Sequence, residues 1–144
     1  MPTPNMTGDW QFIATLTVDG VKLEDNWDAI EGGDTTSATR TFRAGGQLYA
    51  ESMPGPPTTA DIVLERAYRG SIDGALRTQL ANAIGREARV TIVTLGADHR
   101  PISGTSETIT GVLKEVTRPD FRSESAGVAL YKVVVAPHGV WKGT

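Results

Sequence analysis

The sequence predicts one domain, residues 1–144, that is mainly β-stranded and has a single α-helix. A chain of 144 residues is long enough to fold around one hydrophobic core without disulfide bonds. Its 16 glycines and 8 prolines indicate many turns. Several segments alternate apolar and polar residues with the two-residue period of a strand, whereas only one segment has the four-residue spacing of a helical stripe.

The first strand is predicted between Trp10 and Val18, where apolar and polar residues alternate with one exception, Ile13. The preceding residues, 1–9, are small and polar, and we expect them to form a loosely held N-terminal arm. Asp19-Gly20 follows the strand directly, and this dipeptide tolerates the positive φ angles of a tight hairpin turn. We therefore expect the chain to reverse direction here.

Residues 32–58 are predicted to form one long excursion from the domain, and a connection of this length is usually functional. The stretch Glu31–Gly46 has a glycine pair near each end and is rich in Thr, Ser and Arg, a composition that favours a strand. It lacks the apolar stripe that would cover a core. Met53–Pro57 contains three prolines, which have no backbone donor and exclude a central strand.

The single helix is predicted at residues 71–84. Ser71 is the expected N-cap, Asp73 suits the positive end of the helix dipole, and Gly85 is placed to end the helix. The apolar residues recur every four positions and form one stripe, which predicts packing against a sheet. The stripe consists of Ile72, Leu76, Leu80 and Ile84.

Four further strands are predicted after the excursion, and the helix lies between the first and the second of them. They are Asp61–Tyr68, Val90–Leu95, Thr105–Arg118 and Val128–Ala136. The third of these is unusually long, and we expect a bulge or bend at Gly111. Residues 137–144 follow the last strand and are predicted to form a C-terminal tail.

The aromatic residues divide into core and surface candidates. Trp10 and Trp27 are expected to fill the core, because both lie in alternating apolar segments. Trp141 is either a docking residue or a partly exposed aromatic of the tail. Phe42 and Tyr49 lie in the excursion, where an aromatic side chain either folds back onto its own domain or anchors a protein–protein contact.

No arrangement of residues indicates catalysis, and we expect a protein without enzymatic activity, cofactor or metal. The chain has no cysteine, and its two histidines, His99 and His138, lie in turn-like contexts without spaced metal partners. No Gly-x-Ser-x-Gly motif is present. Glu107 and Glu115 are predicted to share one face of the long strand, but at ~3.3 Å per residue they are about 26 Å apart. That separation is too large for the carboxylate pair of a glycosidase.

Charge and hydropathy argue against two kinds of partner. The formal net charge is −3 and the isoelectric point about 5.3, whereas a protein that neutralises phosphates needs a basic surface. No apolar run approaches the roughly 18 residues of a membrane helix. The first ten residues also lack the basic and apolar regions of a secretory signal. We therefore expect neither specific nucleic-acid binding nor a membrane-spanning segment.

The order of several motifs resembles the phage tail tube proteins, including the inner-tube proteins of contractile injection systems. The motifs extend from Leu16 to Trp141, and their order and spacing are together more specific than any one of them. They are TVDG (Thr17–Gly20), WxxIEGG (Trp27–Gly33), RxGG (Arg43–Gly46), MPGPPTTADIVLERAY (Met53–Tyr68), TGVLKEVTRP (Thr110–Pro119) and LYKVVVAPHGVW (Leu130–Trp141).

The resemblance implies a tail-tube β-sandwich or barrel, with two packed antiparallel sheets and a helix on the flank. Six subunits would form a ring whose inner sheets join into a β-barrel around a lumen, and rings would stack into a tube. The excursion 32–58 would then be an inter-subunit hairpin that reaches a neighbouring chain. The candidate contact residues on it are Arg40, Phe42, Arg43, Leu48, Tyr49 and Met53.

The lumen candidates are Glu107 and Glu115. A ring of six chains would have a formal charge of 6 × −3 = −18, and negative walls would repel phosphates and let DNA slide without specific binding. A solvated outer face is the other interpretation of these two residues.

The main hypothesis is therefore a structural subunit of a phage tail tube that conducts DNA during ejection. Such a protein would assemble in the host cytoplasm and reside in the virion tail. Its partners would be copies of itself, a tail terminator, baseplate and tape-measure proteins and, in contractile systems, a sheath protein. The alternatives are a terminator or baseplate component, the inner tube of an injection system, and a stand-alone β-sandwich that binds glycans.

Overall fold

The structure, a computed structural model, describes residues 7–8, 10–19, 21–22, 27–46, 48–119, 121, 123 and 127–143. Most of the predicted N-terminal arm and Gly20 of the predicted turn lie outside these residues. In chain order the elements are β1 (Phe12–Val18), β2 (Val21–Lys22), β3 (Ala29–Gly32), β4 (Thr35–Phe42), β5 (Glu51–Thr59), β6 (Ile62–Ala67), α1 (Gly70–Asn82), β7 (Glu87–Thr94), β8 (Glu107–Val116) and β9 (Leu130–Gly143).

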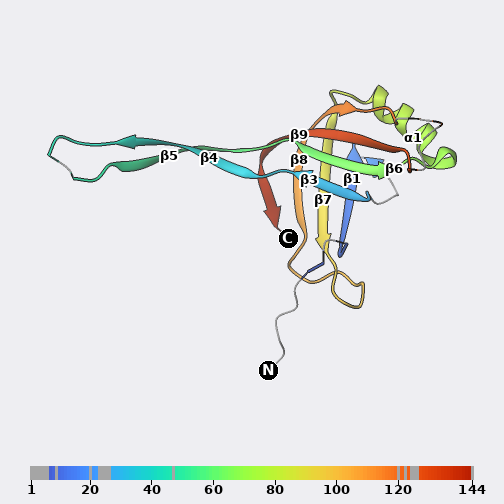
Figure 1. Cartoon of the computed structure of the whole chain (residues 1–144), viewed down its shortest axis with the longest axis horizontal. Coiled ribbons are helices and arrows are strands. Elements are labelled where there is room, and N and C mark those ends of the chain that lie inside the picture. The colour runs from blue at the N-terminus through green and yellow to red at the C-terminus, as the bar shows by residue number, and fades with distance from the viewer. Residues whose placement is uncertain are drawn as a thin grey trace.

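The main body is one curled antiparallel sheet of seven strands in the order β2-β1-β7-β8-β9-β6-β3. Figure 1 shows the curl, since β9, β6 and β3 run across the direction of β1, β7 and β8. Strands β4 and β5 form a separate two-stranded sheet that extends from the body as a long hairpin (Figure 1). The predicted mainly β fold with one flanking helix and a long hairpin excursion is confirmed, and its two antiparallel sheets are very unequal in size.

The core follows the predicted alternation along β1, in which Ala14, Leu16 and Val18 are buried. Trp27 is also buried, as predicted. The core prediction for Trp10 is wrong, because its side chain is 63% exposed. The strand begins only at Phe12, so Trp10 precedes the buried run, and its ring lies 5.2 Å from the ring of His99 in a surface turn.

The last strand is longer than predicted, and the predicted tail at 137–144 is wrong, because β9 continues to Gly143. From Pro137 onward β9 pairs with the first half of β8, beginning opposite Gly111. A proline has no backbone N–H, so it removes one hydrogen bond from the strand pair on the side to which that N–H would point. It is tolerated here because β6, the strand on the other side of β9, pairs only as far as Val135.

Two register shifts bend the β8–β9 pair, one between Thr108 and Thr110 and the other between Leu113 and Glu115. They lie on either side of Gly111, where the sequence predicted a single bulge or bend. At Gly111 the two backbones approach so closely that a Cβ atom would meet the backbone of β9. The glycine therefore permits close contact between the strands, and the bulges next to it bend them.

Helix α1 packs only part of its predicted apolar stripe against the sheet. Leu80 is buried and Leu76 is partly buried against the core. Ile72 and Ile84, at the two ends of the stripe, are 46% and 48% exposed. The helix ends at Asn82, so Ile84 lies beyond its last turn.

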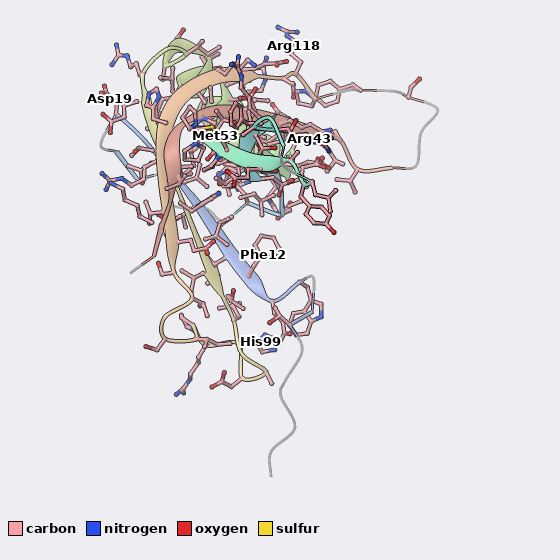
Figure 2. All side chains as sticks on the ribbon, turned by 90° about the vertical axis from the view of Figure 1, so that its left-hand side faces the viewer. Phe12, Asp19, Arg43, Met53, His99 and Arg118 are labelled. Atoms are coloured by element: carbon pink, nitrogen blue, oxygen red, sulfur yellow. The ribbon has the colours of Figure 1, made fainter. Side chains whose placement is uncertain are left out.

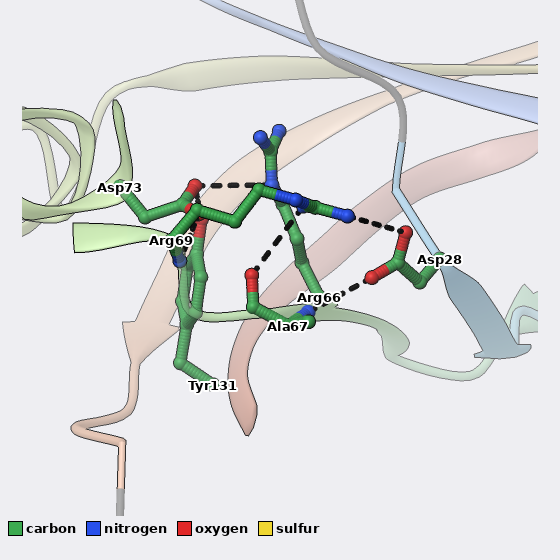
Figure 3. A network of polar contacts seen from close by, with 6 residues as sticks. All are labelled: Asp28, Arg66, Ala67, Arg69, Asp73 and Tyr131. Carbon is green, nitrogen blue, oxygen red and sulfur yellow. Dashed lines mark hydrogen bonds and ion pairs between the residues drawn. The ribbon is translucent and has the colours of Figure 1, made fainter. Parts of the chain in front are cut away.

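A buried polar network joins the start of the helix to the sheet (Figure 3). The carboxylate of Asp73 is fully buried: its Oδ1 accepts a hydrogen bond from the Tyr131 hydroxyl at 2.7 Å and lies 3.0 Å from Arg66 Nε. Its Oδ2 accepts the backbone N–H of Arg69 at 2.7 Å. Arg69 is the N-cap residue, so the prediction of Ser71 as the N-cap is wrong, and Asp73 closes the first turn from within the helix.

The network joins three elements, because Arg66 lies on β6, Asp73 on α1 and Tyr131 on β9. Both charged side chains are almost completely buried, so the loss of one would remove a buried opposite charge from beside the other. Burial and the hydrogen bond to Asp73 raise the pKa of Tyr131. Its hydroxyl therefore remains a proton donor well above the ordinary tyrosine pKa of about 10.

Replacement of Asp73 by alanine is expected to lower the free energy of unfolding by about 3–5 kcal/mol, because the buried Arg66 charge would lose the carboxylate beside it. Urea denaturation followed by circular dichroism measures this loss. The matched control is Asp61→Ala, which removes an exposed ion pair to Lys114 (2.7 Å) and should cost about 0–1 kcal/mol. Equal losses in the two variants would contradict the assigned role of the network.

Candidate assembly interface

The hairpin β4–β5 is a ribbon with no core of its own. All eight residues of β4 are exposed, and within the described residues β4 pairs only with β5. The pairing extends from Thr35 opposite Thr59 to Phe42 opposite Glu51, with one irregularity after Ser37. Three prolines lie on β5, which agrees with the prediction that this segment is not a central strand. The outer edge of β4 thus has backbone groups available to another chain, whereas the prolines of β5 supply no donors on theirs.

The distal half of the ribbon has two different faces. Arg40 pairs with Met53 and Phe42 with Glu51, so these four side chains lie on one face. The side chain of Phe42 is 56% exposed and that of Met53 is 61% exposed, so neither side chain folds back onto the domain. The opposite face is small and polar; it consists of Thr39, Thr41, Ser52 and Pro54.

The remaining contact candidates lie at the tip of the hairpin, between β4 and β5. Leu48 and Tyr49 are 78% and 80% exposed, and Arg43 is exposed as well. In Figure 2 the hairpin points toward the viewer, and the labels of Arg43 and Met53 mark it in front of the body. Gly46 has a φ of 85°, in the region that favours glycine, and this permits the turn. All six predicted contact residues are therefore exposed on this ribbon, and their role in contacts remains a prediction.

The root of the hairpin is held by the C-terminal part of β9. The indole Nε1–H of Trp141 donates to the Gly33 carbonyl at 2.9 Å, and the Thr59 hydroxyl donates to the Gly139 carbonyl at 2.5 Å. A Cβ atom at Gly33 would lie 3.1 Å from the Trp141 ring. Trp141 is thus a docking residue, one of its two predicted interpretations. The contact joins residues 108 positions apart in the chain, and no local pattern around the predicted tail indicates it.

The main sheet also offers edges at which another strand could pair. At one end, β2 covers only Thr17 and Val18 of β1. At the other end, β3 pairs with β6 and has no second neighbour among the strands that the structure describes. Exposed edges of this kind readily pair with strands of other chains.

The two lumen candidates lie on opposite faces, so the prediction that they share one face is wrong. Glu107 is opposite Ile92, which packs against the core, whereas Glu115 is opposite Val134 on the outer face. The cause is the bulge at Lys114, which adds one residue to β8 and reverses the facing of the residues after it. If one face of the sheet lined a lumen, only one of these two carboxylates could point into it.

The histidines do not form a metal site with other residues. His99 lies in a surface turn as predicted, but His138 lies within β9 rather than in a turn. In the part of the chain that the structure describes, no group of three or more His, Asp or Glu side chains could hold a metal ion. Over the same residues, no helix is long and apolar enough to cross a membrane.

Comparison with known proteins gives matches only among solved structures, since no protein-family model and no curated protein matches the sequence. A chain of the six-fold symmetrised baseplate structure of the anti-feeding prophage (AFP) has a TM-score of 0.75 and 16% identity, with 100% of this chain and 97% of that chain covered. A chain of the AFP tube-terminating cap has a TM-score of 0.76 and 15% identity, with coverages of 100% and 94%.

A third match comes from the sheath–tube complex of the PVC extracellular contractile injection system in its extended state. Its TM-score is 0.72 and its identity 16%, with 96% of this chain and 91% of that chain covered. At such identities the likeness shows a shared fold, so the resemblance inferred from the motifs is confirmed at that level. The three matched chains come from a baseplate, a tube-terminating cap and a sheath–tube complex.

Replacement of Trp141 by phenylalanine is expected to loosen the hairpin root while leaving the body folded. The variant loses the hydrogen bond to Gly33, which should cost about 0.5–1.5 kcal/mol. Amide hydrogen exchange of β4 and β5 should then be faster than in the wild type, since the hairpin depends on few contacts with the body. Trp10→Phe is the control, because this exposed side chain lies far from the root; unchanged exchange in Trp141→Phe would refute the assignment.

Proposed function

We propose that this chain is a structural subunit of the inner tube of a contractile injection system, and that it assembles as stacked rings of six. The observation that supports this most is the β4–β5 hairpin, a fully exposed ribbon held at a defined root. The fold shared with chains of injection-system assemblies supports it independently. The role is architectural, without catalysis or a cofactor.

The energetics of the ribbon favour a partner. A two-stranded hairpin is marginally stable in water by itself, and its unpaired edges and exposed Phe42 and Met53 gain no burial within one chain. Contact with a neighbouring copy would pair the outer edge of β4 and bury Phe42 and Met53. Closure of a ring would satisfy the edges next to β1 and β3 in the same way.

An injection-system tube is favoured over the DNA-conducting tube of a phage, which was the main hypothesis from the sequence. The matched structures are a baseplate and a tube-terminating cap of the anti-feeding prophage and the sheath–tube complex of a contractile injection system, and the six-fold symmetry of the AFP baseplate agrees with a ring of six. A sheath, a terminator and a baseplate are therefore the proposed partners. Conduction of DNA and residence in a virion receive no separate support.

A terminator or cap subunit is the second candidate, because the AFP cap and the PVC sheath/tube terminator share the fold with TM-scores of 0.76 and 0.68. The two candidates differ in the assembly that they form. A tube subunit stacks ring upon ring without limit, whereas a terminator forms one closed ring.

Negative-stain electron microscopy of the purified full chain at high concentration is expected to show hollow tubes with a regular axial repeat. Such tubes would also allow the number of subunits in each ring to be measured. Isolated rings that never stack would instead favour the terminator. Particles that stay monomeric at all concentrations, and also in the presence of preformed rings, would count against both candidates.

The double replacement Phe42→Ser and Met53→Ser is expected to abolish assembly while leaving the monomer folded. Both side chains are exposed on the same face of the ribbon and none of the core depends on them, so the free energy of unfolding should change by less than about 0.5 kcal/mol. Sedimentation of assembled material and circular dichroism measure the two effects. The matched control on the opposite face, Thr41→Ala with Ser52→Ala, should assemble normally; equal loss of assembly would place the contact elsewhere.

A further inference from the structure

A hollow of about 310 Å³ lies on the face of the main sheet that points away from the core. It is at the lower end of the range of ligand pockets, about 300–1,000 Å³. Strands β7, β8 and β9 form its floor and walls, and the residues that line it include Arg89, Thr108, Thr110, His138 and Lys142. None of these residues belongs to the hairpin or to the buried network.

The register of the three strands places these side chains in two adjacent rows. In one row Arg89 is opposite Thr110, which is opposite His138. In the next row Thr91 is opposite Thr108, which is opposite Lys142. Ala88 and Val90 on either side of Arg89 are fully buried, so both rows point away from the core.

The hollow itself results from an irregularity in β9. Between the two rows β8 advances by two residues, from Thr108 to Thr110, whereas β9 advances by four, from Lys142 to His138. The additional residues on β9 leave the plane of the ladder, and Gly139 and Val140 line the hollow. Hydroxyl groups on the central strand are thus bordered by basic side chains on the strands at either side.

The basic side chains that line the hollow differ in their ion pairing from four other basic side chains of the domain. Arg66, Arg86, Lys114 and Lys132 each form an ion pair with a carboxylate. Arg89 and Lys142 form no ion pair with any residue that the structure describes, and neither of the two rows contains an acid. The acid closest along the same face is Glu87, two residues before Arg89 and outside both rows.

We propose that this hollow binds a phosphate group. Two permanent cations, two threonine hydroxyls and an imidazole supply donors from three strands, and an arginine can bind phosphate oxygens with two parallel hydrogen bonds. A phosphate has up to two negative charges and at least three acceptor oxygens, which match this set of donors. A carboxylate has one charge and two oxygens, so some of these hydrogen-bond donors would have no acceptor. The site belongs to the single chain and does not depend on assembly.

The test is calorimetric titration of the purified full chain with pyrophosphate at low salt. Saturable binding is expected, and Arg89→Gln or Lys142→Gln should each weaken it by about tenfold, since each removes one charge-assisted contact. Circular dichroism confirms that the variants remain folded, as expected for exposed residues outside the core. The matched control is Arg100→Gln, which removes the same charge from an exposed turn outside the hollow.

Two results would overturn the proposal: wild-type protein that shows no saturable binding, or equal weakening in Arg100→Gln. A short thymidine oligonucleotide then identifies the source of the phosphate. If the oligonucleotide displaces pyrophosphate and binds less tightly as salt is raised, the ligand is a nucleic-acid backbone. If it does not displace pyrophosphate, the ligand is a small phosphorylated compound.

Discussion

The backbone pairing of β9 is the interaction on which the other parts of the molecule depend. This strand of 14 residues pairs with β6 along its first half and with β8 along most of its length. The core residues Tyr131, Val133 and Val135 lie on it. Beyond the core, Gly139 and Trp141 bind the root of the hairpin. One strand thus fixes both the curl of the body and the position from which the hairpin extends.

The same strand separates two kinds of surface. Its bulge at Gly139 and Val140 accepts a hydrogen bond from the hairpin root and also lines the basic hollow. Without the bulge, β9 would follow β8 residue for residue between His138 and Lys142, and the hollow between the two rows would be lost. The proposed assembly function and the proposed phosphate site therefore share one local departure from regular pairing.

The parts of the fold that were predicted from the sequence are those in which local pattern and tertiary environment agree. The alternation in β1, the helix near residues 71–84 and the glycine pairs at the hairpin are properties of short segments. Trp10 shows the limit of this approach, since it continues the apolar period of β1 but lies beyond the point where β7 covers the strand. The sequence pattern predicts which face of β1 is buried, but the extent of pairing with β7 determines where along the strand the burial ends.

By itself the sequence determined the β class, the single helix and the unusual polar ribbon, because each depends on residues close together in the chain. Tertiary structure decided the rest. The bulge at Lys114 places Glu107 and Glu115 on opposite faces of the sheet. Asp73 on the helix contacts Arg66 and Tyr131, which lie on two different strands. Arg89 and Lys142 meet at one hollow although 53 positions separate them (142 − 89). Such groupings arise from strand register, which long-range pairing sets and local periodicity does not encode.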